Sequence, residues 1–392
     1  MTGGSSRAVP FVRRVRVKNY RSIADSDVTL GPLTVLLGFN ASGKSNFLDV
    51  LKLVADALRT SLAQAVSDRG GLDALLFRGP AGVADSFEIM LDLTLPPVRG
   101  GEPLLARYGF VAGSDPAGQL PLVVHTEIAL FLRPDGEMGG PLFRDGQSSR
   151  LRLSSTVARD DEPAGILETS LRAMAFYELN SAVLAGLDEP PPGVPVLGPA
   201  GEHLGPVLGS LARKDHLGKE RLDAYLAALV PNALGVDERT EGRYSTVQAR
   251  FLAGDGGEVE TFLRETLSEG TLRATGVLGA LFQPAVFSGR IPLVAIEEPE
   301  TAIHPAGVGA LYEALDDASQ RTQVIVTSQS SDLLDNEYVR LDHIRAVANV
   351  DGVTRIGEVD AAGHAIVEKG LMSISELHRT GQMQPAWSEG GQ

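Results

Sequence analysis

The sequence predicts an α/β fold with a mixed sheet, an antiparallel β part in its first lobe and a helical insertion. Three observations carry this prediction. An apolar run at residues 34–37 leads into a glycine-rich loop, and an amphipathic helix leaves that loop at Lys44. Strand-like and helix-like segments alternate in the last third of the chain, which is typical of a mainly parallel sheet covered by helices. Residues 87–153 instead contain successive short strands separated by turns, which indicates an antiparallel region.

The predicted elements follow one another in a clear order. Residues 11–40 predict a strand, a turn and a second strand, before the helix that begins at Lys44. Residues 164–186 and 218–230 predict helices, whereas residues 186–207 contain six prolines and predict a surface loop or hinge. We therefore expect four parts: a flexible N-terminus at 1–10, a first lobe at 11–155, a helical insertion or lid at 156–258, and a second lobe with a C-terminal helix at 259–392.

The composition is that of a folded protein. The chain has 392 residues, of which 43% are hydrophobic, and its length suggests two or three domains of roughly 150 residues. It has no cysteine, which excludes a disulfide framework and a thiolate metal site. The first residues lack the apolar core of a signal peptide, and no uncharged apolar run reaches the roughly 18 residues of a transmembrane helix. We expect a cytoplasmic protein without membrane contact.

Charge is unevenly distributed along the chain. The net charge is −15, from 35 Lys and Arg against 50 Asp and Glu, which is not the profile of a protein coated in nucleic acid. Residues 1–24 nevertheless have a local charge of +6, because they contain no acid and six cations: Arg7, Arg13, Arg14, Arg16, Lys18 and Arg21. Residues 14–18 alternate basic and apolar side chains, as a half-exposed strand does. Two interpretations are open: a solvated strand face, or a surface that contacts phosphates.

A phosphate-binding loop is the strongest motif in the sequence. Residues 38–45 read GFNASGKS and fit G-x-x-x-x-G-K-[ST] between a strand and a helix. Gly38 and Gly43 allow the backbone to curl with its N–H groups turned inward, and the helix N-terminus adds partial positive charge. We expect Lys44 to contact the β- and γ-phosphates of ATP and Ser45 to offer its hydroxyl to Mg²⁺. The candidate ATP-binding residues of this loop are Gly38, Asn40, Ala41, Ser42, Gly43, Lys44 and Ser45.

Two later strand ends carry polar side chains. The apolar residues 293–296 end in Glu297 and Glu298. Because adjacent side chains at a strand end point in different directions, one carboxylate can serve the Mg²⁺ shell while the next polarises the attacking water. We expect Glu297 to have the metal role and Glu298 the catalytic role. A third apolar strand, at 324–327, is followed by Gln329 at the position of a γ-phosphate sensor.

A second phosphate-binding helix end is predicted before these strands. Residues 267–271 read LSEGT and precede an apolar helix, for which Ser268 is a suitable N-cap. A serine and a glycine at a helix N-terminus form an anion-binding end, so Ser268 and Gly270 are candidate nucleotide ligands. Such a pentapeptide is common, but its place in the order is specific: phosphate-binding loop, this signature element, the Glu-Glu strand, then the polar strand end.

That order resembles the order of motifs in ABC-type ATPases, and the chain is similar to their soluble branch, the RecF, SMC and OLD-nuclease ATPases. The resemblance covers roughly residues 11–380 and rests on KNYRSI at 18–23, the loop through Asn46, LSEGT at 267–271, IEEPE at 296–300 with His304 and Pro305, and TSQS at 327–330. It implies a P-loop NTPase of the ABC-ATPase type. It also implies that Arg21 and Asn46 contact the nucleotide, and that Lys44, Glu298 and Gln329 act in hydrolysis.

The resemblance implies partners as well. Two protomers are expected to sandwich two ATP molecules, so that Ser268 and Gly270 act in trans in a homodimer. The expected process is DNA-related, either DNA repair and recombination or anti-phage defence, with DNA as a partner. After Asp332 only 392 − 332 = 60 residues remain, which is too few for an appended Toprim nuclease domain. A nuclease or other effector is therefore expected on a separate chain.

Departures from the family pattern leave alternatives open. Glu297 stands where the wider superfamily has Asp, Gln329 stands where it often has His, and no Q-loop glutamine is recognisable before residue 260. Because Gln cannot accept a proton, the alternative is a slow or non-hydrolytic ATP-dependent scaffold. A transporter subunit is the least favoured reading, since the 267 − 45 = 222 positions between Ser45 and Leu267 are roughly double what a transporter subunit needs.

Overall fold

The chain forms two compact units in a computed structural model. The structure describes residues 9–80, 82–97, 102–132, 136, 138–140, 142–143, 148–155, 162–253 and 257–386. Unit 1 contains Met1–Met174, Ile344–Ala365 and Met383–Gln392, and unit 2 contains Ala175–His343 and Ile366–Gln382. Most of the N-terminus expected to be flexible, residues 1–8, lies outside the described residues.

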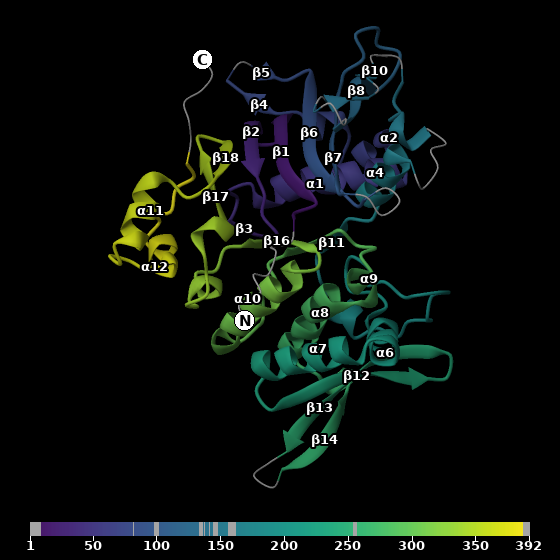
Figure 1. The fold of residues 1–392 in the computed structure, drawn as a ribbon, viewed down its shortest axis with the longest axis vertical. Helices are drawn as coiled ribbons and strands as arrows, with labels where there is room; N and C mark the ends of the chain where they lie inside the picture. Colours follow the sequence, from purple (N-terminus) through teal and green to yellow (C-terminus); the bar gives the residue numbers. More distant parts are fainter. Residues whose placement is uncertain are drawn as a thin grey trace. The chain divides into compact units, whose positions relative to one another are not determined.

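An antiparallel sheet forms a large part of unit 1 (Figure 1). Its described strands are β1 (Val12–Tyr20), β2 (Ile23–Thr29), β6 (Ser86–Leu95), β7 (Leu104–Gly113), β8 (Val123–Leu132), β9 (Met138–Gly139) and β10 (Leu142–Phe143). Their order is β10-β8-β7-β6-β1-β2, and β9 pairs with β8. In β1, Val15 and Val17 are buried while Arg14 and Arg16 are partly exposed, which confirms the alternation predicted for residues 14–18.

A second group of strands in unit 1 positions the phosphate-binding loop. The buried strand β3 (Leu33–Leu37) leads into the loop, and helix α1 (Lys44–Arg59) leaves it, as the sequence predicted. Strand β17 (Ile344–Val350) pairs with β3 in parallel, and β18 (Val353–Gly357) pairs with β17 in antiparallel register. A segment near the end of the chain therefore returns to the loop near its beginning.

Helix α1 is the main helix of unit 1. Its buried face includes the apolar residues whose helical spacing predicted it: Phe47, Leu48, Leu51, Val54 and Leu58. It contacts β1, α2 and α4. The smaller elements of the unit are α2 (Leu62–Ser67), α3 (Leu72–Leu75), β4 (Arg78–Gly79), β5 (Gly82–Val83), a 3₁₀ turn (Leu153–Ser155) and α4 (Pro163–Arg172).

Three parallel strands form the centre of unit 2. They are β11 (Ala175–Tyr177), β15 (Leu293–Glu297) and β16 (Gln323–Ser328), and β15 pairs with both of the others. The helices that follow the signature element and β15 are α8 (Glu269–Phe282), α9 (Pro284–Phe287) and α10 (Val308–Ser319). The strand–helix alternation predicted for the last third of the chain is confirmed in this unit.

The expected helical insertion also contains an antiparallel sheet. Its described helices are α5 (Ser181–Leu184), α6 (Leu204–Lys214) and α7 (His216–Leu229). They are followed by β12 (Ala233–Glu241), β13 (Tyr244–Ala253) and β14 (Glu258–Leu263), which pair in that order (Figure 1). The insertion therefore contains a three-stranded antiparallel sheet in addition to the expected helices. Strand β14 could not be recognised from the sequence because it is exposed along most of its length and lacks an apolar alternation.

Residues 186–203 of the proline-rich segment form no helix or strand, apart from one bridge between Asp188 and Ser245, whereas residues 204–207 begin helix α6, so the loop expected at 186–207 ends four residues earlier. It is nevertheless anchored. Leu197 is buried, its N–H donates to Gln283 Oε1 at 3.1 Å, and the N–H of His203 donates to Asp188 Oδ2 at 2.8 Å. This segment is thus a fixed connection between α5 and α6 in unit 2.

The unit boundaries differ from the segment boundaries expected from the sequence. Unit 1 continues through α4 to Met174 rather than stopping at residue 155, and it takes back Ile344–Ala365 from the expected second lobe. The single C-terminal helix expected is two short helices, α11 (Ala361–Glu368) and α12 (Ile374–Arg379). None of the helices in the described residues has the length and apolar character needed to cross a membrane.

Candidate functional site

The phosphate-binding loop lies between a buried strand and an uncapped helix. Helix α1 begins at Lys44, its N-cap is Gly43, and neither a side-chain cap nor an acidic residue occupies its first turn. The first N–H groups of a helix need an acceptor, and the helix dipole favours a negative one. The loop therefore presents N–H groups that suit an anion. Two of its residues have left-handed backbones, Ala41 with φ 61° and Gly43 with φ 104°.

Two polar side chains of the loop are buried. Lys44 is 6% exposed, and its Nζ donates to the carbonyl oxygens of Gly38 at 2.7 Å and Phe39 at 3.0 Å. Ser42 Oγ is buried without a hydrogen-bond partner among the described residues. Leaving a buried hydroxyl without a hydrogen bond costs free energy, so an oxygen atom of a ligand that accepted a hydrogen bond from Ser42 would remove this cost. Ser45 is exposed, so its hydroxyl is accessible to a ligand of the loop.

The turn between β1 and β2 packs on helix α1. Arg21 has φ 50°, and its guanidinium lies 2.8 Å from Asp49 of α1, which also accepts hydrogen bonds from Tyr20 and Arg69. Asn46 Nδ2 donates to Ser22 Oγ at 2.6 Å. The structure thus brings Arg21 and Asn46 to the helix of the loop, but a carboxylate already engages the Arg21 side chain.

In unit 2, β15 ends at the two adjacent carboxylates. Glu298 has φ 44°, a left-handed conformation that is strained for a residue with a side chain, and its N–H donates to Thr327 O of β16 at 3.0 Å. Gln329 Nε2 lies 3.4 Å from Glu298 Oε2. The structure therefore places the predicted base beside the predicted sensor. Glu297, the last residue of β15, lies level with Thr327.

Glu300 is a buried carboxyl that sequence reasoning missed. It is 9% exposed, and Ser328 Oγ donates to its Oε1 at 2.6 Å, while Oε2 is buried with no hydrogen-bond partner in the part of the chain that the structure describes. Burial raises the pKa of the Glu300 carboxyl. This bond ties the acidic loop (residues 297–303) to the end of β16. The only feature of the sequence that pointed to Glu300 was its place as the fourth residue of the EEPE run at 297–300.

The signature element is the N-terminus of α8. Ser268 caps the helix as predicted, because its Oγ accepts from the N–H of Thr271 at 3.2 Å, and Ser268 is exposed. A Cβ on Gly270 would lie 2.4 Å from the carbonyl oxygen of Ala302, so only glycine allows this approach to the acidic loop.

Arg273 joins the signature element to the acidic loop, and nothing in its sequence position predicted this. Its guanidinium donates to the carbonyl oxygens of Leu179 at 2.7 Å, Thr301 at 3.0 Å and Glu298 at 3.4 Å. One side chain of α8 therefore holds the backbone on both sides of Pro299. Unit 2 thus groups Ser268, Gly270, Glu297, Glu298 and Gln329 in linked segments, whereas unit 1 groups Arg21 with the loop 38–46.

The basic N-terminal stretch is largely neutralised by carboxylates. Arg14 pairs with Asp27, Arg16 with Asp92 at 2.9 Å, Lys18 with Asp25 at 3.8 Å and Arg21 with Asp49 at 2.8 Å. These partners come from β2, β6 and α1, so the charge of +6 counted along the chain is not a free cationic surface. The structure favours the solvated strand face over the phosphate surface.

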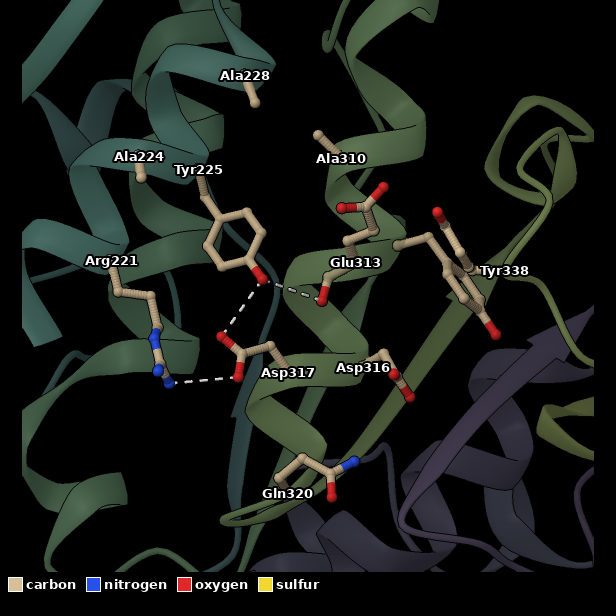
Figure 2. A pocket seen from close by; sticks show the side chains of 11 residues that line it. Arg221, Ala224, Tyr225, Ala228, Ala310, Glu313, Asp316, Asp317, Gln320 and Tyr338 are labelled. Atoms are coloured by element: carbon tan, nitrogen blue, oxygen red, sulfur yellow. Dashed lines mark hydrogen bonds and ion pairs between the residues drawn. The ribbon is translucent and has the colours of Figure 1, made fainter. Parts of the chain in front are cut away.

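One cavity lies within unit 2, between α7 and α10 (Figure 2). Its volume is about 910 Å³, and its ionisable lining residues are Arg221, Tyr225, Tyr312, Glu313, Asp316, Asp317 and Tyr338. The Tyr225 hydroxyl and the Arg221 guanidinium each lie 3.3 Å from Asp317, and burial raises the pKa of Tyr225 to about 12. Three carboxylates against one guanidinium repel phosphates, so this cavity is not the nucleotide site.

Comparisons with known proteins agree with this geometry. The curated OLD nuclease of Thermus scotoductus is 41% identical over 52 residues, which cover 13% of this chain and 10% of that nuclease. The chain therefore matches only a tenth of the length of this relative.

Two solved SMC head structures are similar across most of the chain. An SMC head bound to the C-winged helix domain of ScpA has a TM-score of 0.55 at 15% identity, covering 88% of this chain and 97% of that one. An SMC head with an extended coiled coil, bound to the C-terminal domain of ScpA from Pyrococcus furiosus, has a TM-score of 0.55 at 13% identity, covering 93% and 100%. The likeness establishes that the chain has the fold of these SMC heads, and it confirms the predicted fold class.

A family model extends this assignment to the sequence. The model described as "AAA domain, putative AbiEii toxin, Type IV TA system" matches residues 33–335, a span that contains the phosphate-binding loop, the signature element, the acidic loop and Gln329. This span is more than half of the 392 residues. The chain therefore belongs to this family of AAA-type ATPase domains.

Proposed function

We propose that the protein binds and hydrolyses ATP with Mg²⁺, dimerises on ATP, and uses this cycle to switch a DNA-related process through a separate effector chain. The observation that carries the proposal is the phosphate-binding loop: an uncapped helix N-terminus, a buried lysine and an unpaired buried hydroxyl converge on one loop. Each of these features suits a polyphosphate.

The residues around the loop fit a nucleotide and its metal. Lys44 is held over the loop by the carbonyl oxygens of Gly38 and Phe39, so its ammonium exchanges these acceptors for phosphate oxygens without leaving the loop. Ser45 and Glu297 are oxygen ligands of the kind that Mg²⁺ prefers, the serine directly and the carboxylate through a water. Bound Mg²⁺ would neutralise charge on the phosphate oxygens.

Glu298 is the proposed base for hydrolysis. Its strained backbone and its contact with Gln329 hold the carboxylate at a defined place at the end of β15. Gln329 cannot take a proton, so its role is to orient Glu298 or the attacking water by hydrogen bonding. Arg273 supports the same backbone from α8, which links the signature element to this carboxylate.

Head-to-head dimerisation is supported by the exposure of the signature element. Ser268 is exposed and Gly270 is partly exposed, and the N-terminus of α8 beside them offers N–H groups to an anion. In the proposed dimer, these two residues contact the ATP bound to the loop 38–45 of the partner protomer. This head-to-head arrangement is inferred from the resemblance to ABC-type ATPases.

The DNA-related role and the separate effector rest on relatives. The matched stretch belongs to an OLD nuclease, and the matched folds are SMC heads. We propose that cleavage, where it accompanies this ATPase, is performed by another chain. Purified protein that cleaves DNA by itself, and loses this activity on Lys44→Ala, contradicts the proposal of a separate nuclease.

Two substitutions test the ATPase. Lys44→Ala is expected to weaken ATP binding at least about tenfold, because it removes the charge that faces the phosphates. Glu298→Gln is expected to keep ATP binding while lowering kcat by about 10²–10⁴, the usual contribution of a general base. Phosphate release and equilibrium binding of a fluorescent ATP analogue measure the two effects. Glu260→Gln, an exposed change on β14, is the matched control.

The same variant tests the dimer. With hydrolysis blocked, Glu298→Gln in ATP is expected to accumulate as a species of twice the mass of one chain in light scattering, and Ser268→Arg is expected to abolish this species. A monomer at all ATP concentrations contradicts dimerisation. Hydrolysis by Glu298→Gln at the native rate contradicts the base assignment.

A slow or non-hydrolytic scaffold is the second candidate, and Gln329 is the observation that favours it. The amide of Gln329 lies 3.4 Å from the carboxylate of Glu298. An amide cannot take up the proton that Glu298 would remove from water, so hydrolysis would be slow. Steady-state phosphate release separates the candidates: turnover below about 10⁻³ s⁻¹, the scale of an unassisted P-loop GTPase, together with tight ATP binding favours the scaffold. The transporter subunit has no support among these observations.

A further inference from the structure

A chain of hydrogen bonds in unit 1 begins and ends at the phosphate-binding loop. Asn46 Nδ2 lies 2.6 Å from Ser22 Oγ, and Ser22 Oγ lies 2.7 Å from Thr354 Oγ1. Thr354 Oγ1 in turn lies 3.0 Å from the carbonyl oxygen of Ser42. Ser22 belongs to the turn between β1 and β2, and Thr354 belongs to β18. Segments far apart in the sequence thus connect the two ends of the loop.

The number of available protons fixes the direction of this chain. The carbonyl of Ser42 only accepts, so the Thr354 hydroxyl donates its single proton to it. Thr354 therefore accepts from Ser22, and Ser22, whose proton is now used, accepts from the amide of Asn46. A flipped Asn46 amide would present an acceptor to a hydroxyl with no proton left. Every hydroxyl in the chain donates once and accepts once.

Thr354 also packs directly on the backbone of the loop. Thr354 is fully buried, and a Cβ built on Gly43 would lie 2.0 Å from its Oγ1. On the same hairpin, a Cβ on Gly38 would lie 2.1 Å from the carbonyl oxygen of Val347. Both glycines of the motif are therefore needed for the approach of β17 and β18, in addition to the left-handed backbone of Gly43 at φ 104°.

The position of Thr354 is fixed by backbone contacts on two sides. Its N–H donates to the carbonyl oxygen of Ser22 at 2.8 Å, and β18 pairs with β17 through the register Asn349 to Thr354. The two strands are joined at Asp351 and Gly352, whose φ values of 52° and 84° match the preferred two-residue hairpin turn. Thr354 is thus presented to the loop by a rigid element.

We propose that Thr354 is a positioning residue that orients the phosphate-binding loop for the polyphosphate of a nucleoside triphosphate. In a trans peptide the C=O of one residue and the N–H of the next point in opposite directions. By holding the carbonyl of Ser42 outward, Thr354 turns the N–H of Gly43 toward the interior of the loop. Ser22 and Asn46 complete the same clamp. This inference rests on the proposed nucleotide site.

Thr354→Val tests the clamp because it keeps the shape of the side chain and removes only the hydroxyl. The Ser42 carbonyl then loses its donor, and the peptide before Gly43 is free to rotate. We expect the Kd for a fluorescent ATP analogue to rise about tenfold, the effect of one unsatisfied buried group. At saturating ATP, kcat is expected to stay within about twofold, since bound phosphates restore the loop.

Two variants separate the hydroxyl from the packing. Thr354→Ser restores the donor and is expected to bind the analogue within about twofold of the wild type. Thr34→Val is the matched control: Thr34 is 1% exposed, and its hydroxyl accepts from the N–H of Gly31 at 3.1 Å, away from the loop. It is expected to leave the Kd unchanged. Wild-type affinity in Thr354→Val, or equally weak binding in Thr354→Ser, overturns the clamp.

A double-mutant cycle tests the chain itself. Ser22→Ala and Thr354→Val break the same chain, so the double variant is expected to bind no more weakly than Thr354→Val alone. Additive losses overturn the chain. Ser22→Ala also supplies the affinity test should Thr354→Val lower the thermal midpoint too far.

Hydrogen exchange without nucleotide separates the clamp from the proposed function. Thr354→Val is expected to speed exchange of the amides at residues 38–46, and Thr34→Val is not. Unchanged exchange overturns the clamp whatever the protein binds. The proposed nucleotide site is contradicted by a different result: neither the wild-type protein nor Lys44→Ala binds the fluorescent ATP analogue.

Discussion

Glu298 and Glu300 show how two carboxylates of one short run come to have different environments. Glu298 follows the last residue of β15 with a left-handed backbone and contacts Gln329, whereas Glu300 turns inward and accepts a hydrogen bond from Ser328. Pro299 between them is buried. The proposed base therefore stays partly exposed, and the second carboxyl becomes a buried tie between the acidic loop and β16.

The buried carboxyl of Glu300 gives stability a defined pH dependence. Burial raises its pKa above the ordinary value of 4.5, so the folded chain holds the proton more tightly than the unfolded chain. Below pH 4.5 both states hold the proton and nothing is lost. As the pH rises through the folded pKa, the unfolded state has already released its proton and the folded protein loses stability.

Glu300→Gln removes this titration while keeping an acceptor for Ser328. We expect the thermal midpoint of the variant, relative to the wild type, to rise as the pH increases from about 4.5 to 8. Glu376→Gln is the control: the hydrogen bond from the Ser373 backbone lowers the pKa of Glu376, so the contribution of this carboxyl to stability changes only below about pH 4.5, and its difference from the wild type is expected to stay flat from about 4.5 to 8. A flat difference for Glu300→Gln contradicts the buried-carboxyl interpretation.

At the scale of elements, helix α8 is both the signature element and a support for the acidic loop. Its N-terminus approaches Ala302 closely at Gly270, and one turn later Arg273 reaches the carbonyl oxygens of Leu179, Thr301 and Glu298. Arg273 therefore connects α8 directly to the backbone of Glu298. This linkage is a direct physical route between the surface proposed for dimerisation and the proposed base.

Arg273→Ala tests this linkage. It removes three hydrogen bonds from a charged group, so we expect a loss of about 2 kcal/mol in the free energy of unfolding. We also expect lower kcat with ATP binding by the loop largely retained, because the loop lies in unit 1 and Arg273 in unit 2. Chemical denaturation and phosphate release measure the two effects. A variant with lower stability and unchanged kcat limits Arg273 to a structural role.

At the scale of the whole molecule, the ion pairs of β1 change how the charge of the chain is read. The cations of residues 1–24 are counted together only in the sequence, and carboxylates of β2, β6 and α1 lie beside four of them. Exposed ion pairs stabilise weakly, but they cancel the long-range field that attracts a polyanion. The charge of +6 counted along the chain therefore overstates the free positive charge on this strand.

DNA binding in the presence of ATP tests this consequence. Under the proposed DNA-related role, binding measured by gel shift is expected to weaken between about 50 and 200 mM salt, because phosphate contacts release counterions. The double variant Arg14→Ala with Lys18→Ala is expected to change the affinity less than about twofold, since both cations are paired. A large loss of DNA affinity in this variant would show that β1 contacts phosphates. The absence of DNA binding at every salt concentration would exclude DNA as a direct partner.

The sequence by itself determined the local parts of this protein. The phosphate-binding loop between β3 and α1, the capping of α8 by Ser268 and the two carboxylates at the end of β15 depend on neighbouring residues and on periodicity, so they are readable along the chain. The role of each site residue remains a prediction. The strands β12–β14 were missed; for β14 the reason is its exposure along most of its length, which leaves a weak apolar pattern. The segment boundaries expected from the sequence also differ from the two units.

Only the tertiary structure decided which distant residues act together. Thr354 lies on the loop 312 positions after Ser42, Arg273 contacts Leu179 94 positions before it, and Asp92 neutralises Arg16 across 76 positions. None of these pairs has a sequence pattern, since strand pairing and helix packing bring them together after the local elements have formed. The physical reason is that hydrogen bonds and ion pairs depend on distance in space, whereas motifs record only distance along the chain.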